Sequence, residues 1–297
     1  MRSVCDEIEQ LISEFGAKNF YFVDENFLGR CRAGQERGLA FAKEVVRRGL
    51  DIRFSILCRV DDVERSLFSS LKDAGLQRVS VGIESFSENS LQLYNKQIVQ
   101  TDIINCCSVL NSLGIKTYFG WIMFQPFVTI TDLKENLAFM AKYYDSLEVR
   151  AYFSRLMIHP HTSIAETLSK NGVLEIRYSG EGFKSLSYRF TDNRIQRIWD
   201  LLLNLRRKYA ATENAVKKAY LYWLDIDITS MWQTSQDVQD NLTVASQLDR
   251  QLYWLWHSMF YRIIEFVEQE ISGDFREPVF FSERQKEIMN SARLLTS

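Results

Sequence analysis

Several features that would mark a protein class are missing from this sequence. Its five cysteines are scattered, and no two have the C-x-x-C spacing that lets two thiolates reach one metal ion. Cys106 and Cys107 are adjacent and, on a helix, would point in different directions. No apolar run is long enough to span a bilayer. The formal net charge of −2 excludes a basic electrostatic field over the whole molecule, but it does not exclude a local basic groove.

The start of the chain also lacks a secretory pattern, because Met1 leads directly into a charged, helix-like segment. Free thiols suit a reducing compartment. We therefore expect a cytoplasmic protein that meets no membrane and no nucleic acid. The length of 297 residues fits one large domain or one domain with an appendage, and the 46% of hydrophobic residues can form a sizeable core.

The first half of the chain alternates short apolar runs with amphipathic segments. The pattern predicts strands over 20–23, 52–57, 78–81, 116–123 and 148–153, and helices over 2–15, 35–48, 63–72, 101–113 and 132–143. Four of these helices end at a glycine: Gly16, Gly49, Gly75 and Gly114. Strand, helix and glycine recur about every 30 residues, the length of one βα unit. Such units predict a parallel sheet with right-handed crossovers.

The character changes after residue 175. The segment Ser179–Tyr188 is polar, contains glycine and is predicted to be a loop. Aromatic-rich amphipathic helices are predicted over 194–209, 213–223 and 248–270. Aromatic stripes of this kind are more often core than ligand sites, so we expect them to pack internally. The predicted domains are a barrel-like region over 1–175 and a mostly helical region over 176–297.

Polar residues that directly follow the predicted strands are the candidates for function. In barrel-like parallel folds the loops at the carboxyl ends of the strands converge on one face. The residues at these positions are Asp24, Glu25, Asn26, Cys58, Arg59, Glu84, Ser85, Gln125, Arg155, His159 and His161. A carboxylate beside an amide suits an ammonium or hydroxyl-bearing ligand, and an arginine suits a carboxylate.

Most of these candidates have a structural alternative. Asp24 or Asn26 alone would also serve as the cap of a turn. Arg59 lies beside Asp61 and Asp62 and would also form a surface ion pair. Glu84 follows a glycine at a strand end, where the functional reading is favoured.

The histidines favour structural readings. His159 and His161 flank a proline and have no third ligand at a convincing spacing, so we expect surface residues and no metal site. His257 lies in an aromatic helix and is expected to be structural.

At these same positions the sequence resembles the radical S-adenosylmethionine (radical SAM) superfamily, above all the branch that often carries a cobalamin-binding domain. The matching segments are RSVCDEIEQL from Arg2, FYFVDENFLG from Phe20, IRFSILCRVDD from Ile52, LKDAGLQRVSVGIES from Leu71, Leu113–Pro126, and Leu156–Gly172 with its P-x-T-x-I pattern. They follow the order of the family over about the first 175 residues. The resemblance implies a (β/α) barrel of parallel strands, here partial and without its first strand, followed by the helical region.

The resemblance also implies cofactors and site residues. Family members bind S-adenosylmethionine at a 4Fe-4S cluster, and its reductive cleavage gives a 5′-deoxyadenosyl radical or, in cobalamin-dependent members, methyl transfer. By position, the loop Asp24, Glu25 and Asn26 would bind the methionine amino group. Arg59 and Glu84 with Ser85 would contact its carboxylate and ribose. Met123, Gln125 and the segment near Met157 would line the adenine.

The sequence departs from the family at the cluster. The C-x-x-x-C-x-x-C loop and the strand before it are absent, and Cys5 lies in what would be the first helix. Without three thiolates the cluster has no ligands. We therefore expect radical chemistry only from an N-terminally extended form. In that form the cluster, an electron donor and a small-molecule or peptide substrate would take part. The sequence leaves open whether cobalamin is also used.

Two other hypotheses remain open from the sequence. One is a catalytically inactive barrel that serves as a binding or scaffold protein, with its aromatic helices as the partner surface. The other is a metal-free enzyme that uses Glu84 with His159 or His161 for proton transfer.

Overall fold

The structure is a computed structural model that describes residues 1–29, 32–178, 184–229, 236–270 and 273–296. By its internal contacts the chain divides into two compact units. Unit 1 contains Met1–Ile122 with Asp145–Leu147, and unit 2 contains Met123–Tyr144 with Glu148–Ser297. The predicted domain boundary near residue 175 stays a prediction, since the units mark where contacts are dense rather than which part folds alone.

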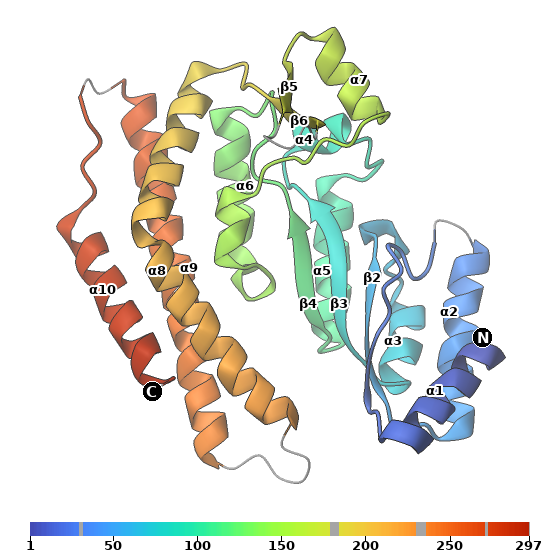
Figure 1. Ribbon diagram of the computed structural model, residues 1–297. Coiled ribbons are helices and arrows are strands. Elements are labelled where there is room, and N and C mark those ends of the chain that lie inside the picture. Colours follow the sequence, from blue (N-terminus) through green and yellow to red (C-terminus); the bar gives the residue numbers. More distant parts are fainter. Residues whose placement is uncertain (30–31, 179–183, 230–235, 271–272, 297) are drawn as a thin grey trace. The chain divides into compact units, whose positions relative to one another are not determined.

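Unit 1 is built on a four-stranded sheet in the order β1-β2-β3-β4, and every neighbouring pair is parallel (Figure 1). The strands are β1 (Asn19–Tyr21), β2 (Arg53–Cys58), β3 (Leu76–Glu84) and β4 (Lys116–Trp121). The helices are α1 (Arg2–Phe15), α2 (Arg32–Arg48), α3 (Arg65–Asp73), α4 (Glu88–Leu93) and α5 (Gln100–Ser112). The 3-10 helix η1 (Val60–Asp62) also belongs to unit 1, whereas η2 (Tyr144–Ser146) begins in unit 2 and ends in unit 1. This arrangement confirms the predicted α/β class with parallel strands.

Alternating burial explains the strands of unit 1. In β2 the side chains of Phe54, Ile56 and Cys58 are buried while those between them are less so. Phe54 packs edge to face against Phe41 of α2, with ring centroids 5.4 Å apart. Phe22 contacts both rings. The full burial of Phe41 and of Phe54 stabilises the fold by about 1.5–3 kcal/mol each.

The four glycine stops predicted from the sequence are confirmed. Gly16, Gly49, Gly75 and Gly114 have φ angles of 63°, 65°, 105° and 61°. At Gly16 the amide donates to Ile12 O at 2.9 Å, which closes α1. The left-handed conformation costs glycine little and other residues more, which is why the sequence places glycine here.

Unit 2 consists mainly of helices. They are α6 (Ile130–Lys142), α7 (Ser163–Lys170), α8 (Asn193–Thr229), α9 (Gln236–Glu268) and α10 (Val279–Leu294), together with the 3-10 helix η3 (Val149–Phe153). The antiparallel strands β5 (Leu174–Tyr178) and β6 (Lys184–Tyr188) form a separate sheet.

The aromatic stripe of α9 is mostly core, as the sequence predicts. Tyr253, Trp256 and Phe260 are buried, and the Tyr253 hydroxyl donates to Met140 O of α6 at 3.0 Å. Trp254 differs, because 39% of its surface is exposed. His257 is buried, and its Nε2 lies 3.0 Å from Leu137 O, which fits its predicted structural role.

One predicted strand and one predicted break between helices were wrong. The predicted strand 148–153 is the 3-10 helix η3, whose neighbouring residues Ala151, Tyr152 and Phe153 are all buried, so its burial does not alternate. A short apolar run does not distinguish strand from helix by periodicity. The predicted helices 194–209 and 213–223 form one helix, α8, because no glycine or proline interrupts residues 210–212.

The predicted loop Ser179–Tyr188 is also wrong in its second part. Residues 184–188 form β6, which pairs with β5 in a register that includes Ile176 opposite Leu186. Residues 179–183 lie outside the described residues. The segment has a polar composition that is typical of a loop, but pairing with β5 stabilises its second part as a strand.

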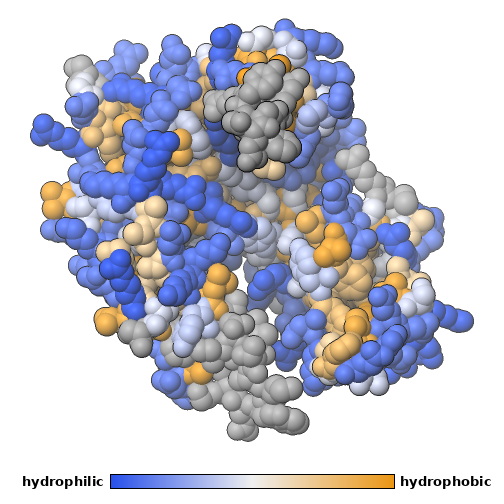
Figure 2. Space-filling view, in the orientation of Figure 1, coloured by the Kyte–Doolittle hydropathy of each residue, from blue (hydrophilic) through white to orange (hydrophobic). Residues whose placement is uncertain are grey.

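The face seen in Figure 2 is mostly hydrophilic, with separate apolar patches. Among the described helices, none is both long and apolar enough to cross a bilayer.

Candidate functional site

Three of the predicted site loops follow neighbouring strands of one parallel sheet. Residues 24–26 come after β1, Arg59 after β2, and Glu84 with Ser85 at the end of β3. The carboxyl ends of parallel strands lie at one edge of the sheet, as the arrowheads of β3 and β4 show (Figure 1). The structure therefore brings these loops to a common edge in unit 1.

Glu84 is held in an unusual conformation. Its φ is 68°, and the register between β3 and β4 shifts between Gly82 and Glu84. Its carbonyl still accepts a hydrogen bond from Ile122 N at 2.7 Å. A left-handed residue other than glycine costs about 1–2 kcal/mol and persists only where its surroundings enforce it. The bulge turns the side chain back over the strand end.

Two glycines make room for the Glu84 carboxylate. A Cβ added to Gly82 would lie 2.9 Å from Glu84 Oε1, and one added to Gly120 of β4 would lie 3.6 Å from Oε2. The carboxylate thus occupies space that side chains at these strand positions would otherwise fill. It remains accessible, with 25% of the side chain exposed.

Lys96 pairs with Glu84 and was missed by the sequence reasoning. Its Nζ lies 3.1 Å from Glu84 Oε1 and donates to Gly82 O, also at 3.1 Å. The residues on either side, Asn95 and Gln97, have positive φ values of 50° and 56°. Strained backbone of this kind gathers at functional sites. The only sequence signal for Lys96 is its place after a short helix, which by itself predicts nothing.

Arg59 is joined to the same group through the backbone of Lys96. Its Nη2 donates to Lys96 O at 2.8 Å, and its Nε lies 2.8 Å from Asp61 Oδ1. A second bond joins Nη2 to Asp61 Oδ2 at 3.2 Å. The ion pair expected as the structural alternative is therefore present. In this conformation the two-pronged face of Arg59 is already taken by Asp61.

The loop after β1 is connected through Asp62. The buried Asp62 carboxylate accepts from Arg59 N at 3.1 Å and also binds the Asn26 side chain. Burial raises the pKa of Asp62, and these two hydrogen bonds oppose the rise. Asn26 Oδ1 also accepts from Leu28 N at 3.1 Å, so the residue does stabilise a turn. Asp24 and Glu25 are exposed.

These contacts form a continuous group, here called the strand-end network: Asn26, Asp62, Arg59, Lys96 and Glu84. It presents a cation and a carboxylate side by side at an accessible edge. Such a pair is complementary to a ligand that carries both charges or that offers a carboxylate and hydroxyl groups.

Ser85 and Gln125 are buried rather than displayed. The Ser85 hydroxyl accepts from Ser87 N at 3.2 Å, and Gln125 Oε1 accepts from Phe127 N at 2.7 Å. Both side chains shape the turns in which they lie. Gln125 belongs to unit 2, so the structure does not place it beside the strand-end network.

The histidine candidates also lie in unit 2. His159 and His161 are exposed, and His161 has a φ of 63°. Glu84 belongs to unit 1, so its pairing with these histidines for proton transfer stays a prediction.

The described cysteines do not suit a 4Fe-4S cluster. Cys5, Cys58, Cys106 and Cys107 are buried, and burial raises the pKa of the first three thiols. No group of three or more cysteine, histidine or carboxylate side chains close enough to hold a metal occurs among the described residues. Cys31 lies outside them. A cluster in this protein would need ligands from beyond the described part of the chain.

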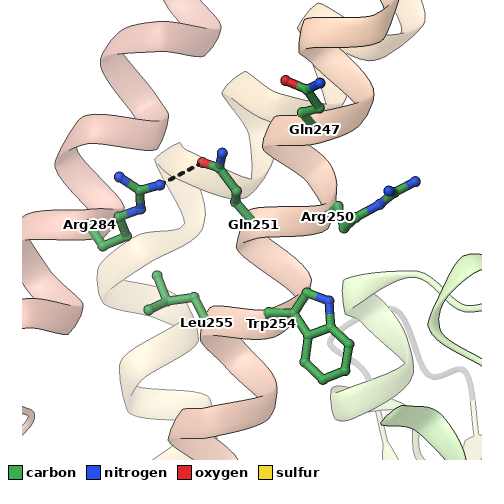
Figure 3. A pocket seen from close by; sticks show the side chains of 6 residues that line it. All are labelled: Gln247, Arg250, Gln251, Trp254, Leu255 and Arg284. Carbon is green, nitrogen blue, oxygen red and sulfur yellow. Dashed lines mark hydrogen bonds between the residues drawn. The ribbon is translucent and has the colours of Figure 1, made fainter. Parts of the chain in front are cut away.

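A separate hollow of about 400 Å³ lies on α9 in unit 2 (Figure 3). Its lining consists of Gln247, Arg250, Gln251, Trp254, Leu255 and Arg284. Arg284 donates to Gln251 Oε1 at 3.1 Å and pairs with Glu287 at 2.5 Å. None of the residues predicted as site residues lines it. The strand-end network is the stronger candidate site, because its charged groups converge while this hollow is open.

Curated proteins similar to this chain include two named enzymes. The 4′-phospho-dehydrooxetanocin synthase of Priestia megaterium is 29% identical over 153 residues, which cover 46% of this chain and 21% of that protein. The anaerobic magnesium-protoporphyrin IX monomethyl ester cyclase of Cereibacter sphaeroides is 32% identical over 126 residues, or 41% of this chain and 20% of that protein. The chain thus spans about a fifth of the length of these relatives.

A solved structure shows the same fold. The cobalamin-dependent S-adenosylmethionine radical enzyme OxsB, with aqua-cobalamin and S-adenosylmethionine bound, superposes on 98% of this chain and 48% of its own chain. The TM-score is 0.68 and the sequence identity is 16%. The barrel-like parallel sheet followed by a helical region, expected from the sequence, is therefore confirmed as a fold.

The sequence match covers the part of the chain that carries the strand-end network. Residues 3–140 match the profile of the radical SAM superfamily. They include β1 to β4 and each member of the network. Over these residues, the chain is similar to the radical SAM superfamily.

Proposed function

We propose that this chain binds S-adenosylmethionine at the strand-end network and supplies that part of an enzyme which modifies a small-molecule or peptide substrate. The observation that carries the proposal is Glu84, a left-handed residue seated over Gly82 and Gly120 and paired with Lys96. The fold shared with OxsB supports it.

The residues present fit the polar parts of S-adenosylmethionine. The Glu84 carboxylate accepts hydrogen bonds and suits the ribose hydroxyls. The Lys96 ammonium suits the methionine carboxylate, and it is held in place by Gly82 O as well as by Glu84. The exposed carboxylates of Asp24 and Glu25 suit the methionine amino group. The role of Gln125 at the adenine stays a prediction, since it lies in unit 2.

When bound beside a reduced 4Fe-4S cluster, S-adenosylmethionine supplies a 5′-deoxyadenosyl radical or a methyl group. The described cysteines do not fit that cluster, so no step of the chemistry is assigned to them. The role of this chain's own residues is to bind and orient the adenosyl ligand. An electron donor, a cluster and cobalamin belong to the proposed complete enzyme.

The alternative of a scaffold protein has less support. It requires the tail aromatics at the surface, and Tyr253, Trp256 and Phe260 are core residues. Trp254 alone of the α9 stripe discussed above is substantially exposed.

Isothermal titration of S-adenosylmethionine into the purified chain tests the proposal. We expect saturable binding that Glu84→Gln and Lys96→Met each weaken about tenfold or more, as loss of a charged hydrogen-bond partner does. Glu88→Gln and Lys116→Met are matched controls, because both residues are exposed and lie outside the network. Absence of binding to the wild-type chain, or equal losses in the controls, would contradict the proposal.

A further inference from the structure

Arg155 in unit 2 lies in an aromatic cage that the proposed function does not use. Its guanidinium carbon is 4.2 Å from the ring centroid of Tyr188, 5.0 Å from that of Phe190 and 5.2 Å from that of Trp199. All three rings belong to buried residues. The backbone of Arg155 forms a parallel bridge with Phe124, and Leu156 N donates to Phe124 O at 2.9 Å. These contacts fix the position of the Arg155 backbone, from which its side chain extends.

The charge of Arg155 has no carboxylate partner within 4.0 Å among the residues that the structure describes. Other shielded arginines do have one. Arg48, with 11% of its side chain exposed, pairs with Asp6 at 2.7 Å, and Arg59, with 15% exposed, pairs with Asp61 at 2.8 Å. Arg155 is itself only partly exposed. A half-buried cation without a counter-ion is costly, and a bound anion would offset that cost.

The Tyr188 side chain does not neutralise the charge of Arg155. Burial raises the pKa of its hydroxyl even though Arg155 lies beside it, so the phenol stays neutral. That hydroxyl donates to Phe124 O at 2.8 Å. The contacts with Arg155 are hydrogen bonds, from Nε to the Tyr188 hydroxyl at 3.3 Å and from Nη2 to Tyr188 O at 3.0 Å.

The guanidinium keeps hydrogen-bonding capacity for a ligand. Of the five N–H groups of an arginine, two are engaged by Tyr188. The planar fork suits a carboxylate or a phosphate, and aromatic rings against its face keep it flat and partly desolvated. Hydrogen bonds to a charged group in such surroundings are stronger than those in water.

We propose that Arg155 binds the anionic group, carboxylate or phosphate, of a ligand in unit 2. The site is distinct in its residues from the strand-end network, and its binding can be measured without S-adenosylmethionine. If the complete protein is an enzyme, this assigns an anionic ligand to it in addition to the adenosyl ligand.

The test follows the side chains of Arg155 and Trp199 by NMR in the chain labelled with ¹⁵N-arginine and ¹⁵N-tryptophan. The Nε–Hε signal of Arg155 is assigned by its loss in Arg155→Lys, and the indole signal of Trp199 by its loss in Trp199→Phe. Inorganic phosphate and acetate are added in separate titrations at constant ionic strength. Arg189→Gln is the matched control, because Arg189 is exposed and donates to Gly172 O at 2.8 Å.

We expect both signals to shift and saturate with at least one anion, with half-saturation on the order of 10 mM or below. The shifts should persist in Arg189→Gln, and that of Trp199 should vanish in Arg155→Lys. Saturation at lower phosphate than acetate indicates a phosphate-bearing ligand, and the reverse order indicates a carboxylate. If neither anion gives a saturable shift in the wild-type chain, the proposal is wrong, whether or not the variants fold.

Discussion

At the scale of single residues, Asp249 on α9 is a half-buried carboxylic acid with the charge of Glu148 nearby. Burial, and secondarily Glu148, raises the pKa of Asp249 to about 6. Because this folded-state pKa lies above the unfolded value near 4, the folded protein holds the proton more tightly. Its contribution to stability is fully present below about pH 4 and is lost as the pH rises through 6.

Asp249→Asn should therefore stabilise the protein only where the acid is ionised. We predict a gain of about 2–3 kcal/mol in the free energy of unfolding at pH 8 and almost none at pH 4. Urea unfolding at both pH values measures this. Asp240→Asn on the same helix is the control, since Asp240 is exposed. A gain that does not depend on pH would rule out the ionisation of Asp249 as its cause.

At the scale of elements, the turn between α3 and β3 depends on Gly75. Its φ of 105° is unfavourable for other residues, and an added Cβ would lie 2.0 Å from Ile52 O. Gly75 O also accepts a hydrogen bond from Phe54 N at 3.0 Å, so the turn is tied to β2. Neither Ile52 O nor Gly75 O can move away without disturbing the sheet that carries the strand-end network.

Gly75→Ala should destabilise the fold by roughly 3 kcal/mol, the sum of backbone strain and a steric clash. Gly49→Ala is the matched control, because Gly49 has a φ of 65° but nothing within 4 Å of an added Cβ. It should cost only about 1 kcal/mol. Equal losses in thermal or urea unfolding would show that the contact with Ile52 does not matter.

At the scale of the whole molecule, the described cysteines are distributed over separate elements. Cys5 is in α1, Cys58 ends β2, and Cys106 and Cys107 are in α5. All four are buried, and burial raises the pKa of Cys5, Cys58 and Cys106, which makes these thiols poor ligands. The arrangement suits core packing rather than a shared metal.

Anaerobic reconstitution with iron and sulfide should therefore leave this chain without stoichiometric iron or the visible absorption of a cluster. An N-terminally extended version with a C-x-x-x-C-x-x-C loop is the positive control and should take up both. Iron content and absorption spectra measure the difference. A cluster on the chain as given would mean that ligands outside the described residues, such as Cys31, take part.

Local pattern alone determined much of the fold. The periodicity of apolar residues and the glycines at 16, 49, 75 and 114 predicted the helices and parallel strands of unit 1, because these depend on neighbours a few residues away. The position after each strand also predicted that the loops after β1, β2 and β3 share one edge. The 3-10 helix η3 and strand β6 were missed, because packing and pairing with distant residues decide them.

Only the tertiary structure decided which side chains meet. Glu84 and Lys96 are separated in the chain by the helix α4, and Arg155 contacts Tyr188 across 33 residues. Contacts of this range follow from how elements pack, and no local spacing encodes them. The sequence determined that polar groups gather at a sheet edge. The folded chain decided that one carboxylate there is pinned by a lysine, and that one arginine elsewhere is enclosed by rings without a counter-ion among the described residues.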